Sequence, residues 1–384
     1  MSMILQKRHI PSPPRMVASI ILVLSIGLFS LLPLNLSAQN DDIGTLFRAG
    51  AADANTLLES YLKPFGAGFG SNLNTGWINT ARPYRPFGFD LRVNAAVAFV
   101  PDAEQMFDIA GLNLTQIEVI DNGSMTPTAF GDDMPGPLVG STTTFTNEQG
   151  EEQRLFEFEM PQGSGYPYVP TPMAQLTIGV PMDTDLSIRF IPTLEFEELS
   201  FRLWGLGAKH SLNQWLPAGE ALPVDLAIQA GFTNLVSEAA LDVQPEIDSE
   251  TEVPEGMEPG SALWDGQAVE LTTSAFTANL LVGKTISVLS LYGGVGYHTS
   301  DMQIRSKGSY PVIELNTDGQ GNVEPERPKI IGRLDDPLDL DLSGGDSLRA
   351  LAGFRLRLGF IAISATYTHS KYPALSAGAG ISFR

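Results

Sequence analysis

Cysteine is absent from the 384-residue sequence, and basic residues are scarce, with 23 lysines and arginines against 44 aspartates and glutamates. The absence of cysteine excludes disulfides, thiolate metal sites and thiol catalysis, and it is compatible with export through an oxidising compartment. The acidic balance argues against nucleic acid as a partner, because nucleic-acid binding requires a concentrated positive surface.

Long apolar runs are also scarce, because the sequence has only one, at residues 16–32. Basic residues including Lys7 and Arg15 precede this run, and small residues ending at Ala38 follow it. This order predicts a cleaved signal peptide over 1–38. The alternative is an uncleaved anchor helix, since the run approaches the roughly 20 residues that cross a bilayer.

The stretch "LRALAGFRLRLGF", residues 348–360, combines apolar residues with three arginines. A helix would scatter these arginines around its circumference. Read with a period of two, Leu348, Phe354 and Leu358 fall on one face, while Arg349 and Arg355 fall on the other. The pattern therefore predicts a strand with one apolar and one polar face.

Strand patterns of this kind dominate the chain from residue 87 to its end. Most are longer than the five or six residues of an ordinary soluble strand, and they match the nine to eleven residues that cross a bilayer at a tilt. We predict an all-β fold, a transmembrane antiparallel up-and-down β-barrel over 87–384. It has ten strands, or twelve if 115–121 and 154–160 add a pair; the competing fold is a soluble β-sandwich. The ten predicted strands are 87–100, 172–181, 184–191, 198–208, 223–233, 269–282, 286–299, 347–358, 360–369 and 374–383.

The joins between these strands are of unequal length. Three long loops, 101–171, 234–268 and 300–346, all follow odd-numbered strands, an asymmetry typical of outer-membrane barrels. These loops hold 31 acidic and 6 basic residues, a net charge of −25. We therefore expect an acidic extracellular face, with both chain ends on the short-turn, periplasmic side. Such a face could bind divalent cations, lipopolysaccharide or an envelope partner.

Residues 39–86 precede the predicted barrel. Apolar residues at helical spacing over 41–63 predict one amphipathic helix that ends at Pro64. The glycine-rich segment after it is predicted to be a flexible connector. We expect residues 39–86 to form a periplasmic or plug helix and a linker.

Three segments carry a resemblance to a known family: "YPALSAGAGISFR" at the C-terminus, "GLGAKHSLNQWLP" and "LYGGVGY". Together they resemble an uncharacterised, domain-of-unknown-function family of Gram-negative outer-membrane β-barrels. The resemblance implies an outer-membrane location and recognition of the last strand by the barrel-assembly machinery. That strand usually closes on an aromatic residue, whereas here Arg384 follows Phe383.

The segment "RAGAADANTLLESYLKP" (Arg48 to Pro64) is similar to the helical hatch that plugs the lumen of long-chain fatty-acid transporters. This chain has Leu62-Lys63-Pro64 where that family has an Asn-Pro-Ala signature. The similarity implies a plugged conduit for hydrophobic or amphipathic solutes.

Six arginines are assigned to the lumenal face by alternation. Guanidinium groups there could grip the carboxylate or phosphate of an amphipathic solute. The alternative is a sealed barrel in which they pair with Asp90, Asp225, Asp53 and Glu59. The six are Arg92, Arg189, Arg202, Arg349, Arg355 and Arg357.

Other candidate sites are weaker. His298 and Ser300 have the His-x-Ser spacing of membrane-barrel lipid hydrolases, but two histidine-bearing strand ends at the upper interface explain the pattern better. The acidic run 335–346 could gather calcium or form a solvated loop. We predict no enzyme activity, no cofactor and no dedicated metal site.

The function expected from the sequence is a passive conduit for a small hydrophobic or amphipathic solute in contact with outer-membrane lipid. The alternative is a non-conducting structural or interaction protein that acts through its acidic loops.

Overall fold

The computed structural model describes residues 51–383 except 122, 147–150, 197–198, 218, 246, 248–250, 317–328, 343 and 345. The predicted signal peptide, residues 39–50 and Arg384 lie outside the described residues.

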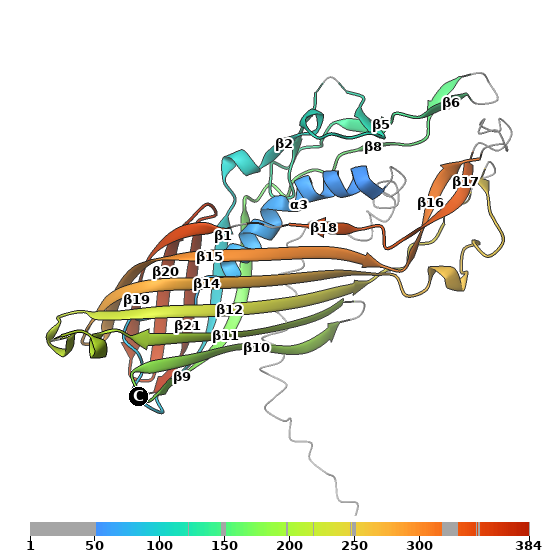
Figure 1. The fold of residues 1–384 in the computed structure, drawn as a ribbon. Coiled ribbons are helices and arrows are strands. Elements are labelled where there is room, and N and C mark those ends of the chain that lie inside the picture. The colour runs from blue at the N-terminus through green and yellow to red at the C-terminus, as the bar shows by residue number, and fades with distance from the viewer. Residues whose placement is uncertain are drawn as a thin grey trace, which may run out of the picture.

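Ten antiparallel strands form a closed barrel (Figure 1). Each strand pairs with its neighbour in the order β14-β12-β11-β10-β9-β1-β21-β20-β19-β15, and β15 pairs back with β14. The predicted all-β up-and-down barrel is thus confirmed, with each predicted strand in place. The strands are β1 (Phe89–Phe99), β9 (Tyr168–Val180), β10 (Thr184–Phe196), β11 (Leu199–Ser211), β12 (Asp225–Ala240), β14 (Ala268–Ile286), β15 (Leu289–Lys307), β19 (Ser347–Leu358), β20 (Ile361–His369) and β21 (Ala374–Phe383).

The barrel closes where the first strand meets the last. Phe89 of β1 lies opposite Phe383 of β21, and their rings stack with centroids 6.2 Å apart. The wall is uneven in height, because β14 and β15 have 19 residues each whereas β20 has nine. Strands β9, β12 and β15 continue into the regions predicted as long loops, whereas the added residues of β14 lie mainly at the short-turn end.

Short elements occupy the long-loop end of the barrel. The prediction that 115–121 and 154–160 add two barrel strands is wrong. They contain β3 and β8, which pair with β5 in a separate sheet and bury Val139 and Phe158 against the N-terminal helix. Three-residue strands are too short to cross a bilayer. The short strands are β2 (Met106–Asp108), β3 (Ile117–Val119), β4 (Met125–Pro127), β5 (Leu138–Ser141), β6 (Thr144–Thr146), β7 (Glu152–Arg154), β8 (Glu157–Glu159), β13 (Thr251–Glu252), β16 (Ser309–Leu315), β17 (Lys329–Asp335) and β18 (Asp339–Asp341).

The N-terminal helix α3 (Ala51–Leu73) continues past the predicted stop at Pro64 and into the segment predicted to be a flexible connector. A side chain at Gly66, Gly68 or Gly70 would collide with Leu342, Val169 or Ser300, respectively. The glycines therefore allow the helix to approach the barrel wall closely. Tertiary packing of Phe65 and Phe69 offsets the loss of the hydrogen bond that proline removes from the helix.

Helix α3 lies at the long-loop end (Figure 1), whereas the sequence predicted both chain ends on the short-turn side, with residues 39–86 as a periplasmic or plug helix and a linker. Its first half packs against the sheet of β3, β5 and β8, where the Asp53 carboxylate accepts hydrogen bonds from the backbone N–H groups of 115–117 at 2.6–3.1 Å. Its second half enters the barrel, and residues 74–86 continue down the lumen to the start of β1. The chain thus passes through its own barrel. The C-terminus does lie at the short-turn end, as predicted.

Among the residues that the structure describes, no helix is both long enough and apolar enough to cross a membrane.

The interior has two layers. Near the long loops, the rings of Phe65 and Phe69 pack against inward apolar residues such as Met173, Phe201 and Leu203. Nearer the short turns, the interior is polar and contains buried arginines. This lower layer is the candidate functional site.

Candidate functional site

Inward residues of neighbouring strands form polar rows across the lower lumen. Arg189, Gln175 and Arg92 lie side by side on β10, β9 and β1. All three side chains are buried. They are positioned by the two-residue period of the strands, which turns every second side chain into the lumen.

Arg189 holds the end of helix α3. Its guanidinium donates to the carbonyl of Leu73 at 2.6 Å and to the carbonyl of Thr75 at 2.7 Å. The same group lies 3.8 Å from the centre of the Trp77 ring, within cation–π range. Because the last carbonyls of a helix have no partners within it and carry partial negative charge, a cation is well placed there.

Two further arginines extend this grip. Arg349 Nη1 donates to the carbonyl of Asn74 at 2.8 Å, and Arg92 Nη2 donates to the carbonyls of Gly76 and Trp77, both at 2.9 Å. The barrel wall therefore supplies guanidinium donors to five carbonyls between Leu73 and Trp77.

The remaining charges form ion pairs near the short-turn end. Asp90 lies 3.7 Å from Arg92 and 3.3 Å from Arg355. Lys209 contacts Asp185 at 2.9 Å and also donates to the carbonyl of Thr80 at 2.9 Å. Asp185 in turn accepts from the backbone N–H of Tyr84 at 2.8 Å. Residues 74–86 are thus tied to the wall along their length.

Not all of the six predicted arginines lie in the lumen. Arg92, Arg189, Arg349 and Arg355 are buried in the lumen, and Arg357 is half-buried on the same side of β19. The prediction that Arg202 faces the lumen is wrong, because its neighbours Phe201 and Leu203 point inward and Arg202 is exposed outside. In the upper layer the inward side chains are apolar because they pack against helix α3. The alternation of polar and apolar residues therefore could not identify the inner face of β11 there.

Sequence reasoning missed three members of the site. Lys209 shares the inward face of Leu203, but the predicted strand ended one residue before it. Asp185 was not singled out, and Trp77 was assigned to the connector. A longer strand would have identified Lys209; no local signal identifies Trp77.

The proposed acidic partners also differ. Asp90 does pair with arginines, whereas Asp53 binds backbone N–H groups at the start of α3. Glu59 is exposed, and Asp225 is half-buried at the start of β12. The arginines bind mainly the carbonyl groups of residues 73–77. We call helix α3 and residues 74–86 together the plug. A count of charges does not predict that arginines bind its carbonyl groups.

His298 and Ser300 lie beneath helix α3 and are buried. His298 Nε2 is 3.1 Å from the hydroxyl of Ser347, and Ser300 lies against Gly70. Helix α3 thus covers the serine. Within the described ranges, no group of three or more histidines and carboxylates could hold a metal ion.

The Trp77 ring sits on a pair of glycines, Gly207 and Gly231, which lie opposite each other on β11 and β12. A methyl group on Gly231 would come within 2.6–2.9 Å of three atoms of this ring. Because these glycines have no side chains, the barrel wall leaves space there for the Trp77 ring, which positions residues 74–86.

We expect Gly231→Ala to destabilise the closed state by about 1–3 kcal/mol, the usual cost of overpacking. Urea unfolding with tryptophan fluorescence measures this effect. Gly111→Ala is the control, because a methyl group there would meet no atom within 4 Å. Equal stabilities of the two variants would show that Trp77 is not seated on these glycines.

Glu104 connects the plug helix to the barrel. It lies 3.6 Å from Lys63 of α3 and 2.7 Å from Lys371 in the turn between β20 and β21. Partial burial acts to raise the pKa of Glu104, but the hydrogen bond from Lys371 and the charges of both lysines outweigh it, and the pKa is lowered.

Because the folded-state pKa of Glu104 lies below its unfolded value, these pairs contribute stability above that unfolded value. The contribution disappears as pH falls through the folded-state pKa. We expect a loss of about 1 kcal/mol or less, since both lysines are half exposed. Unfolding between pH 7 and pH 3 should be less pH-dependent in Glu104→Gln. The exposed Asp102→Asn is the control, and an unchanged slope in Glu104→Gln would contradict the assignment.

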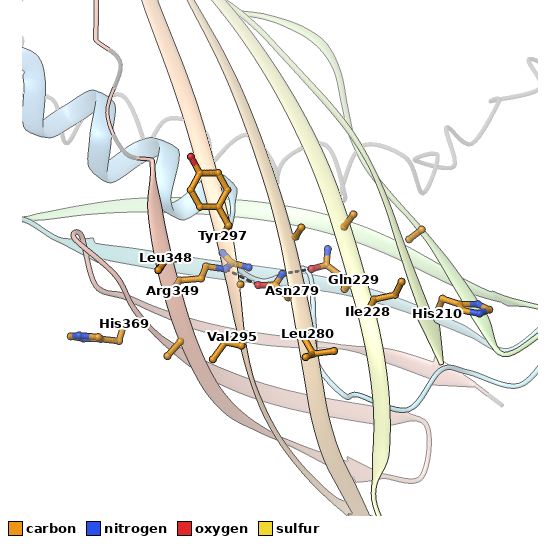
Figure 2. Close-up of a pocket in the computed structure, with 15 residues that line it drawn as sticks. His210, Ile228, Gln229, Asn279, Leu280, Val295, Tyr297, Leu348, Arg349 and His369 are labelled. Carbon is orange, nitrogen blue, oxygen red and sulfur yellow. Dashed lines mark hydrogen bonds between the residues drawn. The ribbon is translucent and has the colours of Figure 1, made fainter. Parts of the chain in front are cut away.

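The outer face of the wall is apolar. Figure 2 shows Arg349, Asn279 and Gln229 linked by hydrogen bonds, together with the exposed residues Leu280 of β14 and Val295 of the neighbouring strand β15. An open depression of about 1050 Å³ lies here, and its lining includes the outward apolar side chains of Ile228, Leu280, Val295 and Leu348. In this lower layer, polar side chains of the lumen are thus enclosed by an apolar exterior.

Comparisons with known proteins give a family and distant structural likenesses. A family model described as "Family of unknown function (DUF6588)" matches residues 16–383. A search of curated proteins found no match.

Among solved structures, the chain is similar to Ail, the attachment invasion locus protein of Yersinia pestis, at 10% identity, covering 78% of this chain and 99% of that one, with a TM-score of 0.22. It is similar to the translocator domain of the autotransporter NalP from Neisseria meningitidis at 13% identity, covering 77% and 88%, with a TM-score of 0.26. It is also similar to a Pseudomonas aeruginosa FadL homologue at 13% identity, covering 83% and 96%, with a TM-score of 0.22. Because these scores are low, the fold described above rests on its own strand pairing.

Proposed function

Because the chain belongs to the DUF6588 family of unknown function, we propose its role from its own geometry. We infer that it is an outer-membrane β-barrel closed by its N-terminal segment, and that it acts through the acidic surface at its long-loop end. The observation that carries this proposal is the grip of Arg189, Arg349 and Arg92 on the end of helix α3.

The membrane location is supported by the exterior of the barrel. Leu91, Ile188, Leu280 and Ile363 point outward on four different strands and are 43–51% exposed. Such a continuous apolar exterior would be unfavourable in water, whereas a closed barrel in lipid satisfies its backbone hydrogen bonds internally. Export would use the predicted signal peptide over 1–38, and assembly would use the C-terminal strand β21.

The closed state is supported by the filling of the lumen. The upper layer is packed with aromatic side chains of the helix, and the lower layer is bonded to residues 74–86. A cavity between Trp77, Arg92 and Lys209 measures about 10 Å³, which accommodates roughly one water molecule. A passive, permanently open conduit is therefore the less favoured function.

The long-loop end of the barrel supports a role in binding a partner. The strands β3, β5 and β8 and the first half of α3 share their own apolar core, so this region is folded. With the strongly acidic composition of the long loops, it could bind divalent cations, lipopolysaccharide or a basic partner in the cell envelope.

A regulated conduit is the second candidate. Its support is the surplus of buried cations in the lumen, which exceeds what ion pairing requires. If the plug were displaced, Arg92, Arg189, Arg349, Arg355 and the half-buried Arg357 would line a path suited to an anionic or amphipathic solute.

Single-channel recording in planar bilayers tests the choice. We expect the refolded mature chain to be silent and Gly231→Ala, which loosens the plug, to show brief openings. A heat-modifiable gel shift confirms refolding. Sustained conductance of the unaltered chain would contradict the closed state and favour the conduit.

A further inference from the structure

The buried charges of the lower lumen do not balance. Among the residues that the structure describes, five cations, Arg92, Arg189, Lys209, Arg349 and Arg355, are buried there with two carboxylates, Asp90 and Asp185. The partial negative charge at the end of helix α3 offsets about half a charge. A buried surplus of positive charge is costly unless a negative group accompanies it.

Three unused hydrogen-bond donors belong to residues that line one cavity in this layer. Within the described part of the chain, Trp77 Nε1, Arg92 Nε and Gln229 Nε2 are buried and have no hydrogen-bond partner. All three residues line the cavity of about 10 Å³ between the plug and the wall, together with Lys209. Unpaired buried donors are rare in folded proteins and call for an explanation.

We propose that this cavity binds a monatomic anion, with chloride as the physiological species. The donors come from an indole, a guanidinium and an amide, and the ammonium group of Lys209 adds a positive charge. The cavity also contains Asp185, whose carboxylate is engaged by Lys209 at 2.9 Å. An anion would satisfy the donors and reduce the charge surplus together, whereas water would satisfy the donors alone.

The site would act as a structural staple between plug and wall. Trp77 belongs to the plug, whereas Arg92 and Gln229 belong to β1 and β12. An anion held by all three would strengthen the closed state. The inference does not depend on whether the barrel conducts, so binding and conductance are tested separately.

Urea unfolding of the refolded mature chain in sodium chloride and in sodium gluconate, at equal ionic strength, tests the proposal. We expect chloride to raise the unfolding midpoint in a saturable way, because a ligand that binds only the folded state stabilises it by mass action. Crystals soaked in bromide should show an anomalous peak between Trp77, Arg92 and Gln229.

Gln229→Glu is the decisive variant, because a carboxylate would replace the anion and still accept the hydrogen bond from Asn279. We expect its unfolding midpoint to be independent of chloride. Gln303→Glu, on the outer side of β15, is the matched control and should keep the response to chloride.

If Gln229→Glu does not refold, Trp77→Phe removes one donor and should raise the half-saturating chloride concentration roughly tenfold. Equal midpoints of the unaltered chain in both salts, or a chloride response that survives in Gln229→Glu, would overturn the proposal. So would the absence of a bromide peak.

Discussion

Replacing Arg189 by methionine is expected to loosen the plug and to convert a silent barrel into one that opens intermittently. The change leaves the carbonyls of Leu73 and Thr75 without their guanidinium donor in a buried environment. Each unsatisfied buried group costs about 1–3 kcal/mol. Removing a buried charge returns part of that cost, so we expect a net loss of about 2–4 kcal/mol.

Two measurements on Arg189→Met check this expectation: the free energy of unfolding in urea, and single-channel conductance in planar bilayers. Arg202→Met is the matched control, since Arg202 is exposed on the outer side of β11. It should remain silent and lose little stability. Equal behaviour of the two variants would show that the lumenal arginine does not hold the plug. The pair also tests the assignment of inner and outer faces on β10 and β11.

The second large effect is expected from Leu280→Arg on the outer wall. Leu280 is 51% exposed on β14, and its cross-strand neighbours Ile228 and Val295 are also exposed and apolar. If this face meets lipid, an arginine near the middle of the bilayer costs about 2–4 kcal/mol.

Unfolding from lipid vesicles, followed by the gel shift, measures the change caused by Leu280→Arg. Met125→Arg is the control, because Met125 is similarly exposed, at 54%, but lies in strand β4 at the long-loop end. A loss in Leu280→Arg alone would support the proposed membrane position. Equal stabilities would contradict a lipid-facing wall.

The barrel itself could be predicted because its signal is local. In a strand, alternate side chains point to opposite faces, so a short stretch such as "LRALAGFRLRLGF" reveals two environments without knowledge of the rest of the fold. Ten such stretches, with all three long joins after odd-numbered strands, predicted the strands and their order. The structure confirms Arg349 and Arg355 on the inner side of β19 and Leu348 and Leu358 on its outer side.

The same signal failed where both faces are apolar. On β11 the inward residues Phe201 and Leu203 pack in the apolar upper lumen, while Trp204 and Leu206 cover the exterior. Arg202 was therefore assigned to the wrong face. Only the position of the helix, which no local pattern contains, explains why this part of the lumen is apolar.

What the sequence by itself determined is the all-β barrel, the acidic long-loop end and the placement of four buried arginines, because each depends on local periodicity or on composition. The tertiary structure alone decided the course of residues 64–86. Glycines at 66, 68 and 70 indicate flexibility when read locally, but they permit close packing once Val169 and Ser300 are beside them. The arginines bind backbone carbonyl groups of the plug. Since every residue type has such a group, the sequence does not identify which ones act as acceptors. The physical reason is that long-range contacts assign these roles.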